Sequence, residues 1–349
     1  MRRLDRVSKN VLKNALKFTG RLRVVEAPPR RDECDVTYDD DCPPPVGRSY
    51  SPGVVIAYPL DQYGVGWGDD DDDHIISAVG IAGDGSGSYR RVGGNGRRRL
   101  AACFDPLDGS GNADASICTG TVFGIFDADA AGLGYDNNDR SSRMNGNGEN
   151  GTADESSYLL SRSVLQPGSE LLAAGYCLYS STTTLVFTLG GGTHGFTLDT
   201  TSNEFVLTHP NMKIPKRGNI YSCNESYVDG WDFRFREYLS NIKNGRGETG
   251  RRYTQRYIGS MVGDVHRTLM YGGIFCCPAD TNVHPDGSLQ LVYKSAPMAY
   301  VLEHAGGKAT DGKIDLLDVR PRDSVHVRSP CFMGSPDDMD ELMTYLRRE

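Results

Sequence analysis

The stretch Phe104–Ser110, with the sequence FDPLDGS, decides how the rest of the chain is interpreted. It follows an apolar run from Leu100 that predicts a buried strand. Pro106 fixes its own φ and removes a backbone donor, so we expect the backbone to leave the strand sharply at this residue. Asp105 and Asp108 would then point the same way at the carboxyl end of the strand. The pattern therefore predicts two carboxylates side by side at one turn.

Two paired carboxylates beside a glycine indicate phosphate chemistry. Hard cations such as Mg²⁺ prefer oxygen ligands of this kind and usually share them with a substrate phosphate. Ser110 follows Gly109 and opens a helix or a tight turn, whose backbone N–H groups would face an anion. A metal and a phosphate at one turn predict metal-assisted hydrolysis of a phosphate ester. Asp and Gly also favour ordinary turns. The segment DPLD alone therefore does not decide between a catalytic site and an ordinary turn.

Composition and charge narrow the class of protein. The chain has 349 residues, enough for one large or two ordinary domains. Its formal charge of -8 argues against nucleic acid as the main partner. The nine cysteines are scattered without a repeated CxxC spacing, which favours reduced intracellular thiols. No apolar run approaches the ~20 residues of a membrane span, and the first residues lack an apolar signal core. We expect no membrane partner and a cytoplasmic location, with the plastid stroma as the alternative.

Changes in composition divide the chain into four parts. The second part is rich in Pro, Gly, Asp and Arg, which favours a disordered insertion, although two apolar patches in it, 54–58 and 75–81, are possible strands. The expected parts are the start of an N-terminal domain (1–26, with a helix over 4–17 and a strand over 22–25), a low-complexity insertion (27–98), the rest of the N-terminal domain (99–210, with a loop insertion at 127–157) and a C-terminal domain (211–349).

Periodicity predicts the main elements of the last two parts. Four strands are expected at 121–126, 182–189, 195–198 and 204–207, and the last three suggest an antiparallel meander. One helix should place Trp231, Phe235, Tyr238 and Ile242 on one face. A second helix should start at Pro297 and stop at Gly306. A third should begin at Ser335, with Met339, Leu342, Met343 and Leu346 facing inward.

Longer motifs carry a family resemblance. The run FDPLDGSGNAD, followed by TGTVFGIF, resembles the fructose-1,6-bisphosphatase family, within the wider group of metal-dependent sugar and inositol phosphatases. RYIGSMVGDVHRTLMYGGIF and LVYKSAPMAYVLEHAGG are two further matches in the right order, and SVLQPGSELLAAGYCLYSSTTTLVFTLG is closest to the plastid-type members. The resemblance implies an α/β fold (an α+β layered sandwich) of two stacked domains with mixed sheets, in a homo-oligomer that is typically a tetramer.

The resemblance also implies a reaction and a set of site residues. The reaction would be Mg²⁺-dependent hydrolysis of fructose 1,6-bisphosphate to fructose 6-phosphate and phosphate. By position, the catalytic residues would be Asp105, Asp108 and Ser110, with Ser110 also holding the leaving phosphate. The metal ligands would be Asp105, Asp108, the carbonyl of Leu107 and, by a shift, Glu26. The sugar and its 6-phosphate would be contacted by Asn224, Tyr227, Arg256, Tyr257 and Met261.

Six positions depart from the family pattern. Asn10 stands where the family usually has an acid, and Pro28 and Pro29 stand near its paired glutamates. Lys294 replaces a glutamate ligand, Cys277 a residue that is normally aromatic, and Ser288 one that is normally lysine.

The change at Lys294 has the largest electrostatic effect. Exchanging a carboxylate for an ammonium alters the local charge by two units, and unit charges ~4 Å apart interact by about 4 kcal/mol at an effective dielectric constant of 20. That is enough to empty a weak metal position. Two alternatives therefore stay open: an impaired or inactive member that acts as a binding or regulatory subunit, and a phosphatase for another sugar phosphate such as sedoheptulose 1,7-bisphosphate.

Overall fold

The structure is a computed structural model that describes residues 23–26, 53–57, 100–128, 163–322 and 324–348. The expected helix over 4–17, the apolar patch at 75–81 and most of the loop insertion at 127–157 lie outside the described residues. The same holds for Asn10, Pro28 and Pro29. Residues 54–57 of the patch at 54–58 are described, and Gly53–Ala57 forms a strand of the first sheet.

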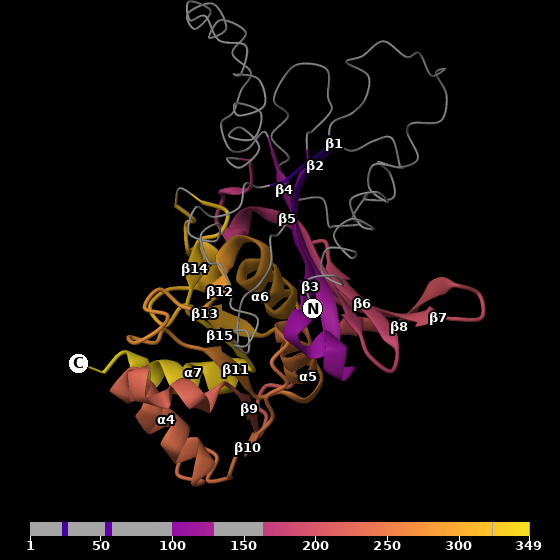
Figure 1. The fold of residues 1–349 in the computed structure, drawn as a ribbon. Helices are drawn as coiled ribbons and strands as arrows, with labels where there is room; N and C mark the ends of the chain where they lie inside the picture. The colour runs from indigo at the N-terminus through magenta and orange to yellow at the C-terminus, as the bar shows by residue number, and fades with distance from the viewer. Residues whose placement is uncertain (1–22, 27–52, 58–99, 129–162, 323, 349) are drawn as a thin grey trace, which may run out of the picture.

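Among the described residues, eight antiparallel strands form the first sheet, and they lie side by side in sequence order (Figure 1). One face of the sheet is buried, as the alternating burial along β4 and β6 shows. The meander predicted for its last part is confirmed. The strands are β1 (Arg23–Glu26), β2 (Gly53–Ala57), β3 (Leu100–Asp108), β4 (Thr119–Asp127), β5 (Leu171–Tyr179), β6 (Thr183–Thr188), β7 (Thr193–Asp199) and β8 (Glu204–Met212).

Strand β3 runs through the FDPLD stretch, so the expected sharp exit at Pro106 is wrong. The register with β4 shifts between Asp105, which lies opposite Val122, and Asp108, which lies opposite Gly120. Such a bulge leaves its inserted residues outside the ladder, and the missing N–H of Pro106 therefore costs no ladder hydrogen bond. The bulge also re-aims the side chains of the two aspartates.

The second sheet, over the described ranges, has five strands in the order β10-β9-β11-β15-β13. It is mixed, because β9 is parallel to β10 and β11, whereas β15 is antiparallel to β11 and β13. A separate two-stranded pair, β12 with β14, lies beside it. The strands are β9 (Ile220–Ser222), β10 (Thr254–Gln255), β11 (Ile274–Cys277), β12 (Leu289–Gln290), β13 (Lys308–Thr310), β14 (Arg328–Ser329) and β15 (Cys331–Gly334).

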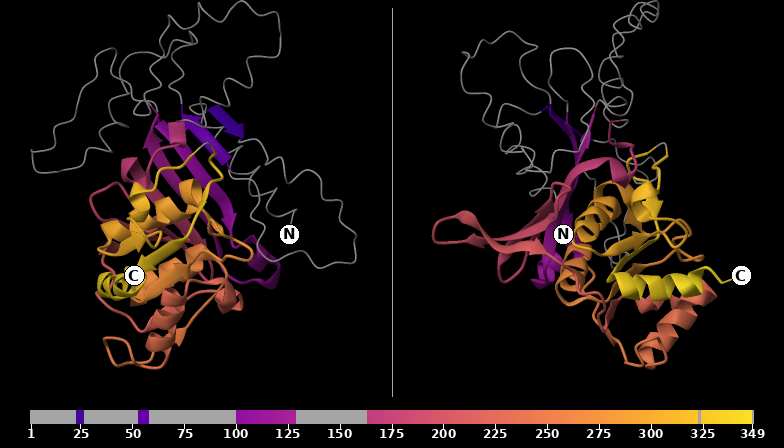
Figure 2. Two further views of the ribbon diagram at one scale, coloured as in Figure 1. Left: turned by 90° about the vertical axis from the view of Figure 1, so that its left-hand side faces the viewer. Right: turned by 180° about the vertical axis from the view of Figure 1, so that it is seen from behind.

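In the part of the chain that the structure describes, four α-helices complete the layers. Helices α5 and α6 contact both sheets and lie between them, whereas α4 and α7 pack together on the far face of the second sheet (Figure 2). The resulting order of sheet, helix, sheet and helix confirms the predicted α/β fold. The longer helices are α4 (Phe233–Lys243), α5 (Met261–Tyr271), α6 (Ala296–His304) and α7 (Pro336–Leu346); the short helical turns are η3 (Ser110–Ala115), η4 (Gly168–Glu170), η5 (Glu225–Gly230), η6 (Leu291–Ser295) and η7 (Leu316–Asp318).

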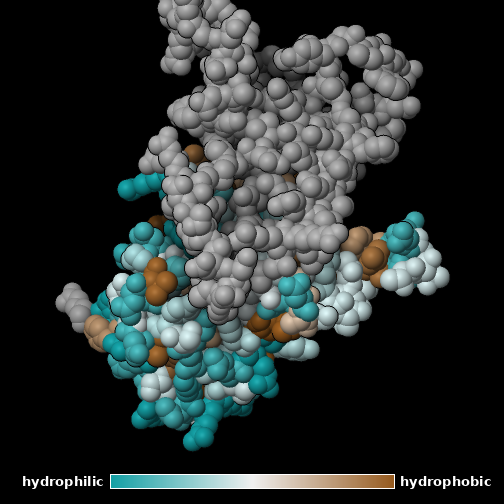
Figure 3. Space-filling model, viewed as in Figure 1, coloured by the Kyte–Doolittle hydropathy of each residue, from teal (hydrophilic) through white to brown (hydrophobic). Residues whose placement is uncertain are grey.

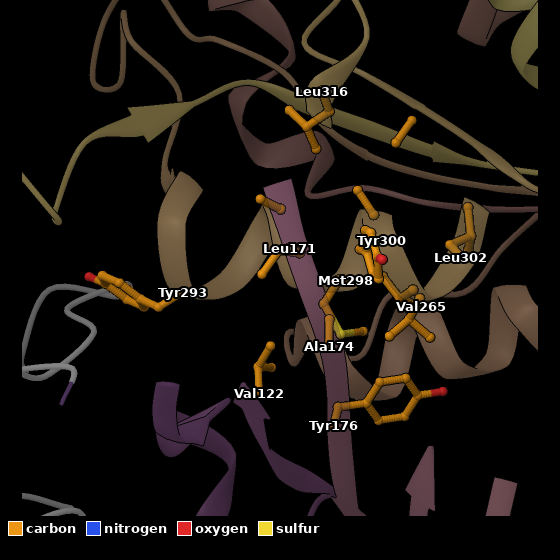
Figure 4. Close-up of a cluster of buried hydrophobic side chains, with 14 of the residues drawn as sticks. Val122, Leu171, Ala174, Tyr176, Val265, Tyr293, Met298, Tyr300, Leu302 and Leu316 are labelled. Atoms are coloured by element: carbon orange, nitrogen blue, oxygen red, sulfur yellow. The ribbon is translucent and has the colours of Figure 1, made fainter. Parts of the chain in front are cut away.

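The larger core lies between the first sheet and helix α6. Val122 of β4 and Ala174 and Tyr176 of β5 face Met298 and Tyr300 of α6 (Figure 4). Burying one large apolar side chain stabilises a fold by about 1.5–3 kcal/mol. This core therefore fixes α6, and with it the segment that precedes α6, against β3 and β4.

A smaller core lies under α4 and α7. Phe235, Tyr238 and Ile242 of α4 are buried on one face, as predicted. On α7, Met339 and Leu342 are buried as predicted, but Met343 and Leu346 are half-buried and Tyr345 is buried in their place. The inward face of α7 is therefore turned slightly from the expected one.

Helix α6 starts one residue before the predicted Pro297 and is preceded by η6, a π-helical turn. Single π-helical turns are rare and are frequently found at functional sites. Lys294 lies in this turn.

None of the helices in the described ranges combines the length and the apolar character needed to span a bilayer.

Candidate active site

The carboxylates of Asp105 and Asp108 converge on one ammonium group, that of Lys294. Lys294 Nζ lies 2.8 Å from Asp105 Oδ2 and 3.1 Å from Asp108 Oδ1. All three residues are 5% exposed or less. The two carboxylates thus point the same way, as the sequence predicts, and the group between them is a lysine side chain.

The remaining carboxylate oxygens have partners of their own. Asp108 Oδ2 accepts hydrogen bonds from Ser260 Oγ and from the Val262 backbone nitrogen, both at 2.9 Å. Asp105 Oδ1 accepts one from the Leu107 backbone nitrogen at 3.3 Å. Asp108 therefore lies at the N-terminus of α5, where the helix dipole favours a negative charge.

The ion pairs keep Lys294 charged in a buried position. Burial alone would lower the pKa of Lys294, but the carboxylates of Asp105 and Asp108 raise it above its usual range. Burial raises the pKa of Asp105, and the Lys294 ammonium opposes that rise. A buried charge is tolerated only when it is paired, so these three groups depend on one another.

The glycine of the motif is required by a close approach. Gly109 has a φ of +71°, which favours glycine, and a Cβ on it would lie 2.6 Å from Ser260 Cβ. Ser110 follows as the first residue of η3 and is half-buried. The end of β3 and the start of α5 are therefore in contact at this glycine.

Three parallel strands of the second sheet bring further predicted site residues together. Asn224 and Tyr227 follow β9, Arg256 and Tyr257 follow the adjacent β10, and Cys277 ends β11 on the other side of β9. The carboxyl ends of adjacent parallel strands meet at one edge of a sheet, which is where ligands bind in open α/β sheets. We refer to Asn224, Tyr227, Arg256 and Tyr257 as the strand-end group.

Members of the strand-end group interact with one another and with residues around them. Tyr257 is 47% exposed; partial burial and the neighbouring Cys277, Asp264 and Tyr227 raise its pKa. The ring of Tyr227 contacts that of His284 edge-on, with centroids 6.1 Å apart. The two tyrosines therefore belong to one cluster.

The other predicted ligand residues have structural contacts as well. Asn224 caps η5 by accepting a hydrogen bond from the Ser226 backbone nitrogen. Arg256 is exposed and donates to the carbonyl of Gln255. Met261, the first residue of α5, is 4% exposed and belongs to the larger core. Among these three, Arg256 alone has a side chain largely free in solvent.

Two positions that depart from the family pattern contact each other. Cys277 Sγ lies 2.9 Å from Ser288 Oγ, and Arg328 donates a hydrogen bond of 2.8 Å to the Ser288 carbonyl. Burial raises the pKa of Cys277, while Ser288, Lys294 and Arg328 lower it. Cys277 therefore connects the strand-end group to the surroundings of Lys294.

The remaining predicted ligand, Glu26, is placed by its backbone alone. Glu26 ends β1 opposite Gly53 of β2, and Gly53 lies opposite Phe104 of β3. Its backbone is thus two strands away from the residue that precedes Asp105. Within the described ranges, no group of three or more His, Cys, Asp or Glu side chains is arranged to hold a metal ion.

Sequence reasoning missed the residues that support the site. Ser260 is the N-cap of α5, and its hydroxyl accepts from the Gly263 backbone nitrogen while donating to Asp108. Asp264 accepts hydrogen bonds from the backbone nitrogens of Ile258 and Gly259, which orders the loop before the cap. A serine directly before an apolar-periodic run is an N-cap signal, so Ser260 was open to prediction.

Family comparisons agree with the fold. The N-terminal domain of the fructose-1,6-bisphosphatases (Fructose-1-6-bisphosphatase, N-terminal domain) matches residues 79–210, and the corresponding C-terminal domain matches residues 214–347. The chain therefore belongs to the fructose-1,6-bisphosphatase family.

Individual relatives come from plants and from a protozoan. The chain is 44% identical over 243 residues to the chloroplastic fructose-1,6-bisphosphatase 1 of Arabidopsis thaliana, which covers 70% of this chain and 55% of that protein. It is 44% identical over 251 residues to the cytosolic enzyme of Brassica napus, covering 72% of this chain and 66% of that protein. The apo crystal structure of Leishmania major fructose-1,6-bisphosphatase is 36% identical, with a TM-score of 0.60 over 72% of this chain and 77% of that one. The chain thus spans less than two thirds of the length of these two plant relatives.

Proposed function

We propose that this chain is a phosphoric monoester hydrolase that removes the 1-phosphate of fructose 1,6-bisphosphate. The observation that supports this most is the convergence of Asp105 and Asp108 on one cationic group at the N-terminus of α5. Cations and helix N-termini both favour a phosphoryl group. The plant relatives are named for the same activity.

The substrate would lie between the two sets of residues described above. In this proposal Ser110 and the backbone after Gly109 hold the leaving phosphate, next to Asp108. The strand-end group and Met261 contact the sugar and its 6-phosphate. The direct bonds of Asp108 to Ser260 and Val262 support this arrangement, because Met261 lies between these two residues in the chain.

Magnesium is the cofactor that the family resemblance implies, with ligands from Asp105, Leu107, Asp108 and Glu26. The described residues do not fit that role as they stand. Every carboxylate oxygen of Asp105 and Asp108 has a polar neighbour within 3.3 Å, and Lys294 Nζ lies between the two side chains. As arranged, the two aspartates therefore leave no place for a metal ion between them.

Lys294 favours a second candidate function, that of a binding or regulatory subunit with little or no turnover. An ammonium group attracts a phosphate, but it does not activate water as a bound metal ion does. Cys277 and Ser288, which contact each other, favour a third candidate, a phosphatase for another sugar bisphosphate such as sedoheptulose 1,7-bisphosphate. These positions are normally aromatic and lysine in the family, and neither side chain here supplies a positive charge for the usual substrate.

One pair of measurements on the purified full chain separates these candidates. Phosphate release from fructose 1,6-bisphosphate, sedoheptulose 1,7-bisphosphate and inositol phosphates is measured beside calorimetric binding of the same compounds. Release from fructose 1,6-bisphosphate that is lost in Asp108→Asn supports the proposed activity. Binding without release supports the second candidate, and a preference for the seven-carbon substrate supports the third. A folded chain that neither binds nor hydrolyses any of them contradicts all three.

We further propose that the chain forms a homo-oligomer and acts in the cytoplasm or, as the alternative, in the plastid stroma. One of the plant relatives is chloroplastic and the other is cytosolic, so they support the two locations equally. Support for self-association comes from the edge strand β8, on which Phe205, Val206 and Leu207 are 43–49% exposed. Apolar residues are visible on the projecting part of the first sheet that contains β7 and β8 (Figure 3). Exposed apolar edge strands tend to pair with another chain.

A further inference from the structure

The position of Lys294 matches that of a cation held by two carboxylates. Its nitrogen is 2.8 Å from Asp105 Oδ2 and 3.1 Å from Asp108 Oδ1, and both oxygens come from the two sides of one β-bulge. Both contacts are ion pairs, and the contact with Asp108 also has the geometry of a hydrogen bond. The nitrogen is therefore held mainly by charge.

The other oxygen of each carboxylate is turned to the protein. Asp108 Oδ2 takes two hydrogen bonds, from Ser260 and Val262, and Asp105 Oδ1 takes one from Leu107. A divalent ion would need to approach the two oxygens that face Lys294, at about 2.1 Å from each for Mg²⁺. The ammonium group already fills that approach and carries the same sign of charge.

Local structure holds Lys294 in this place. It belongs to η6, the π-helical turn that precedes α6, and α6 is anchored in the larger core by Met298 and Tyr300. The Lys294 side chain is 7% exposed, so it has no route to turn outward without breaking both ion pairs. The side chain is thus a fixed part of the site, unlike an exposed lysine that samples many rotamers.

We infer that the Lys294 ammonium is the resident cation of this site, where it takes the place of a divalent metal ion between Asp105 and Asp108. The chain then holds its two carboxylates together without a metal at this position. The two carboxylates and the ammonium group carry one net negative charge, whereas two carboxylates and a divalent ion would be neutral. This inference goes beyond the proposed function, because it concerns the occupancy of the site whether or not the chain turns over a substrate.

Metal binding by the purified full chain tests the inference without an activity assay. Mn²⁺ is titrated into wild type, Asp105→Asn and Lys294→Gln, and bound metal is followed by electron paramagnetic resonance and calorimetry. We expect wild type and Asp105→Asn to bind Mn²⁺ alike, because background binding of Mn²⁺ to acidic segments elsewhere in the chain is the same in both. We expect Lys294→Gln to gain one site, at least about tenfold tighter than that background, because one unit of like charge has gone.

A matched control is Lys308→Gln, which removes an exposed lysine that pairs with Asp340 at 2.6 Å and should bind Mn²⁺ like wild type. Adding Asp105→Asn to Lys294→Gln should abolish the gained site. Two results would overturn the inference: a Mn²⁺ site in wild type that Asp105→Asn removes, or a folded Lys294→Gln chain that gains none. If Lys294→Gln does not fold, the comparison of wild type with Asp105→Asn decides alone.

Discussion

Asp108 and Val262 are joined by a hydrogen bond of 2.9 Å from the Val262 backbone nitrogen to Asp108 Oδ2, across 154 residues of sequence. This bond ties the end of β3 in the first sheet to the first turn of α5. Ser260, the N-cap of that helix, donates to the same oxygen. Arg256 and Tyr257 of the strand-end group lie just before Ser260 in the chain, so the bond also keeps these two residues near the carboxylates.

Removing the cap of α5 should weaken this junction. We expect Ser260→Ala to lower the free energy of unfolding by about 1–2 kcal/mol, because α5 loses its cap and Asp108 loses a hydrogen bond. Urea denaturation followed by circular dichroism measures the change. Ser202→Ala, which removes an exposed hydroxyl bound to Asp199, should change stability little. Equal effects of the two variants would contradict the role assigned to Ser260.

A second buried charge cluster should be more costly to break. Arg217 contacts Glu341 at 2.6 Å and Asp338 at 3.5 Å, and both carboxylates are buried. We expect Arg217→Met to destabilise the fold by about 3–5 kcal/mol, because two buried carboxylates lose their cation. Calorimetric melting measures this.

The matched control for Arg217 is Arg348→Met, because Arg348 forms an exposed pair with Glu237 at 3.1 Å. Exposed pairs contribute about 0–1 kcal/mol, so its melting temperature should stay near that of wild type. A small effect of Arg217→Met, no larger than that of Arg348→Met, would show that the buried cluster is not a stabilising unit.

Glu303 should make stability depend on pH. Burial and the neighbouring Asp315 and Asp318 raise the pKa of Glu303 to about 8. A carboxyl group with a raised pKa is neutral in the folded chain, so its stabilising contribution is complete below its ordinary pKa of 4.5 and is lost as the pH rises to about 8.

Glu303→Gln should remove that loss. We expect the variant to be more stable than wild type at pH 8 by about 1–2 kcal/mol and similar to it at pH 5. Melting temperatures across this pH range measure the difference. Asp311→Asn, which changes an acid on an exposed turn, serves as the control. A difference between wild type and Glu303→Gln that is the same at both pH values would refute the assignment.

Self-association should depend on strand β8. We expect Val206→Lys to shift the purified chain toward the monomer in sedimentation velocity, because the charge disrupts an apolar edge. Ile314→Lys alters a residue of similar exposure, 50% against 49%, at another place and should leave the distribution unchanged. A wild-type chain that is monomeric at micromolar concentration would rule out the homo-oligomer.

Local sequence was enough to predict much of the fold and part of the site. The apolar run before Asp105 predicts β3, and the spacing of Phe235, Tyr238 and Ile242 predicts the buried face of α4. Both features depend on residues that are close together in the sequence, and the periodicity of apolar residues reports such local patterns.

The features that were missed depend on contacts between distant residues. The family resemblance places Lys294 at a ligand position, but its contact with Asp108 spans 186 residues, and no local pattern predicts that contact. Pro106 stays within β3 because the register with β4 admits a bulge, which the turn chemistry of Asp and Pro does not reveal. Met261 is a predicted site residue whose side chain also packs in the larger core, a contact that only the tertiary structure reveals.

The central claim is that Lys294 takes the place of a metal ion between Asp105 and Asp108. Its most direct functional test is phosphate release from fructose 1,6-bisphosphate by wild type and Lys294→Glu, with Mg²⁺ varied from none to millimolar. The account predicts that release by wild type does not change with Mg²⁺, and that Lys294→Glu gains Mg²⁺-dependent release. Wild-type release that rises with Mg²⁺ and is abolished in a folded Lys294→Glu chain would contradict it.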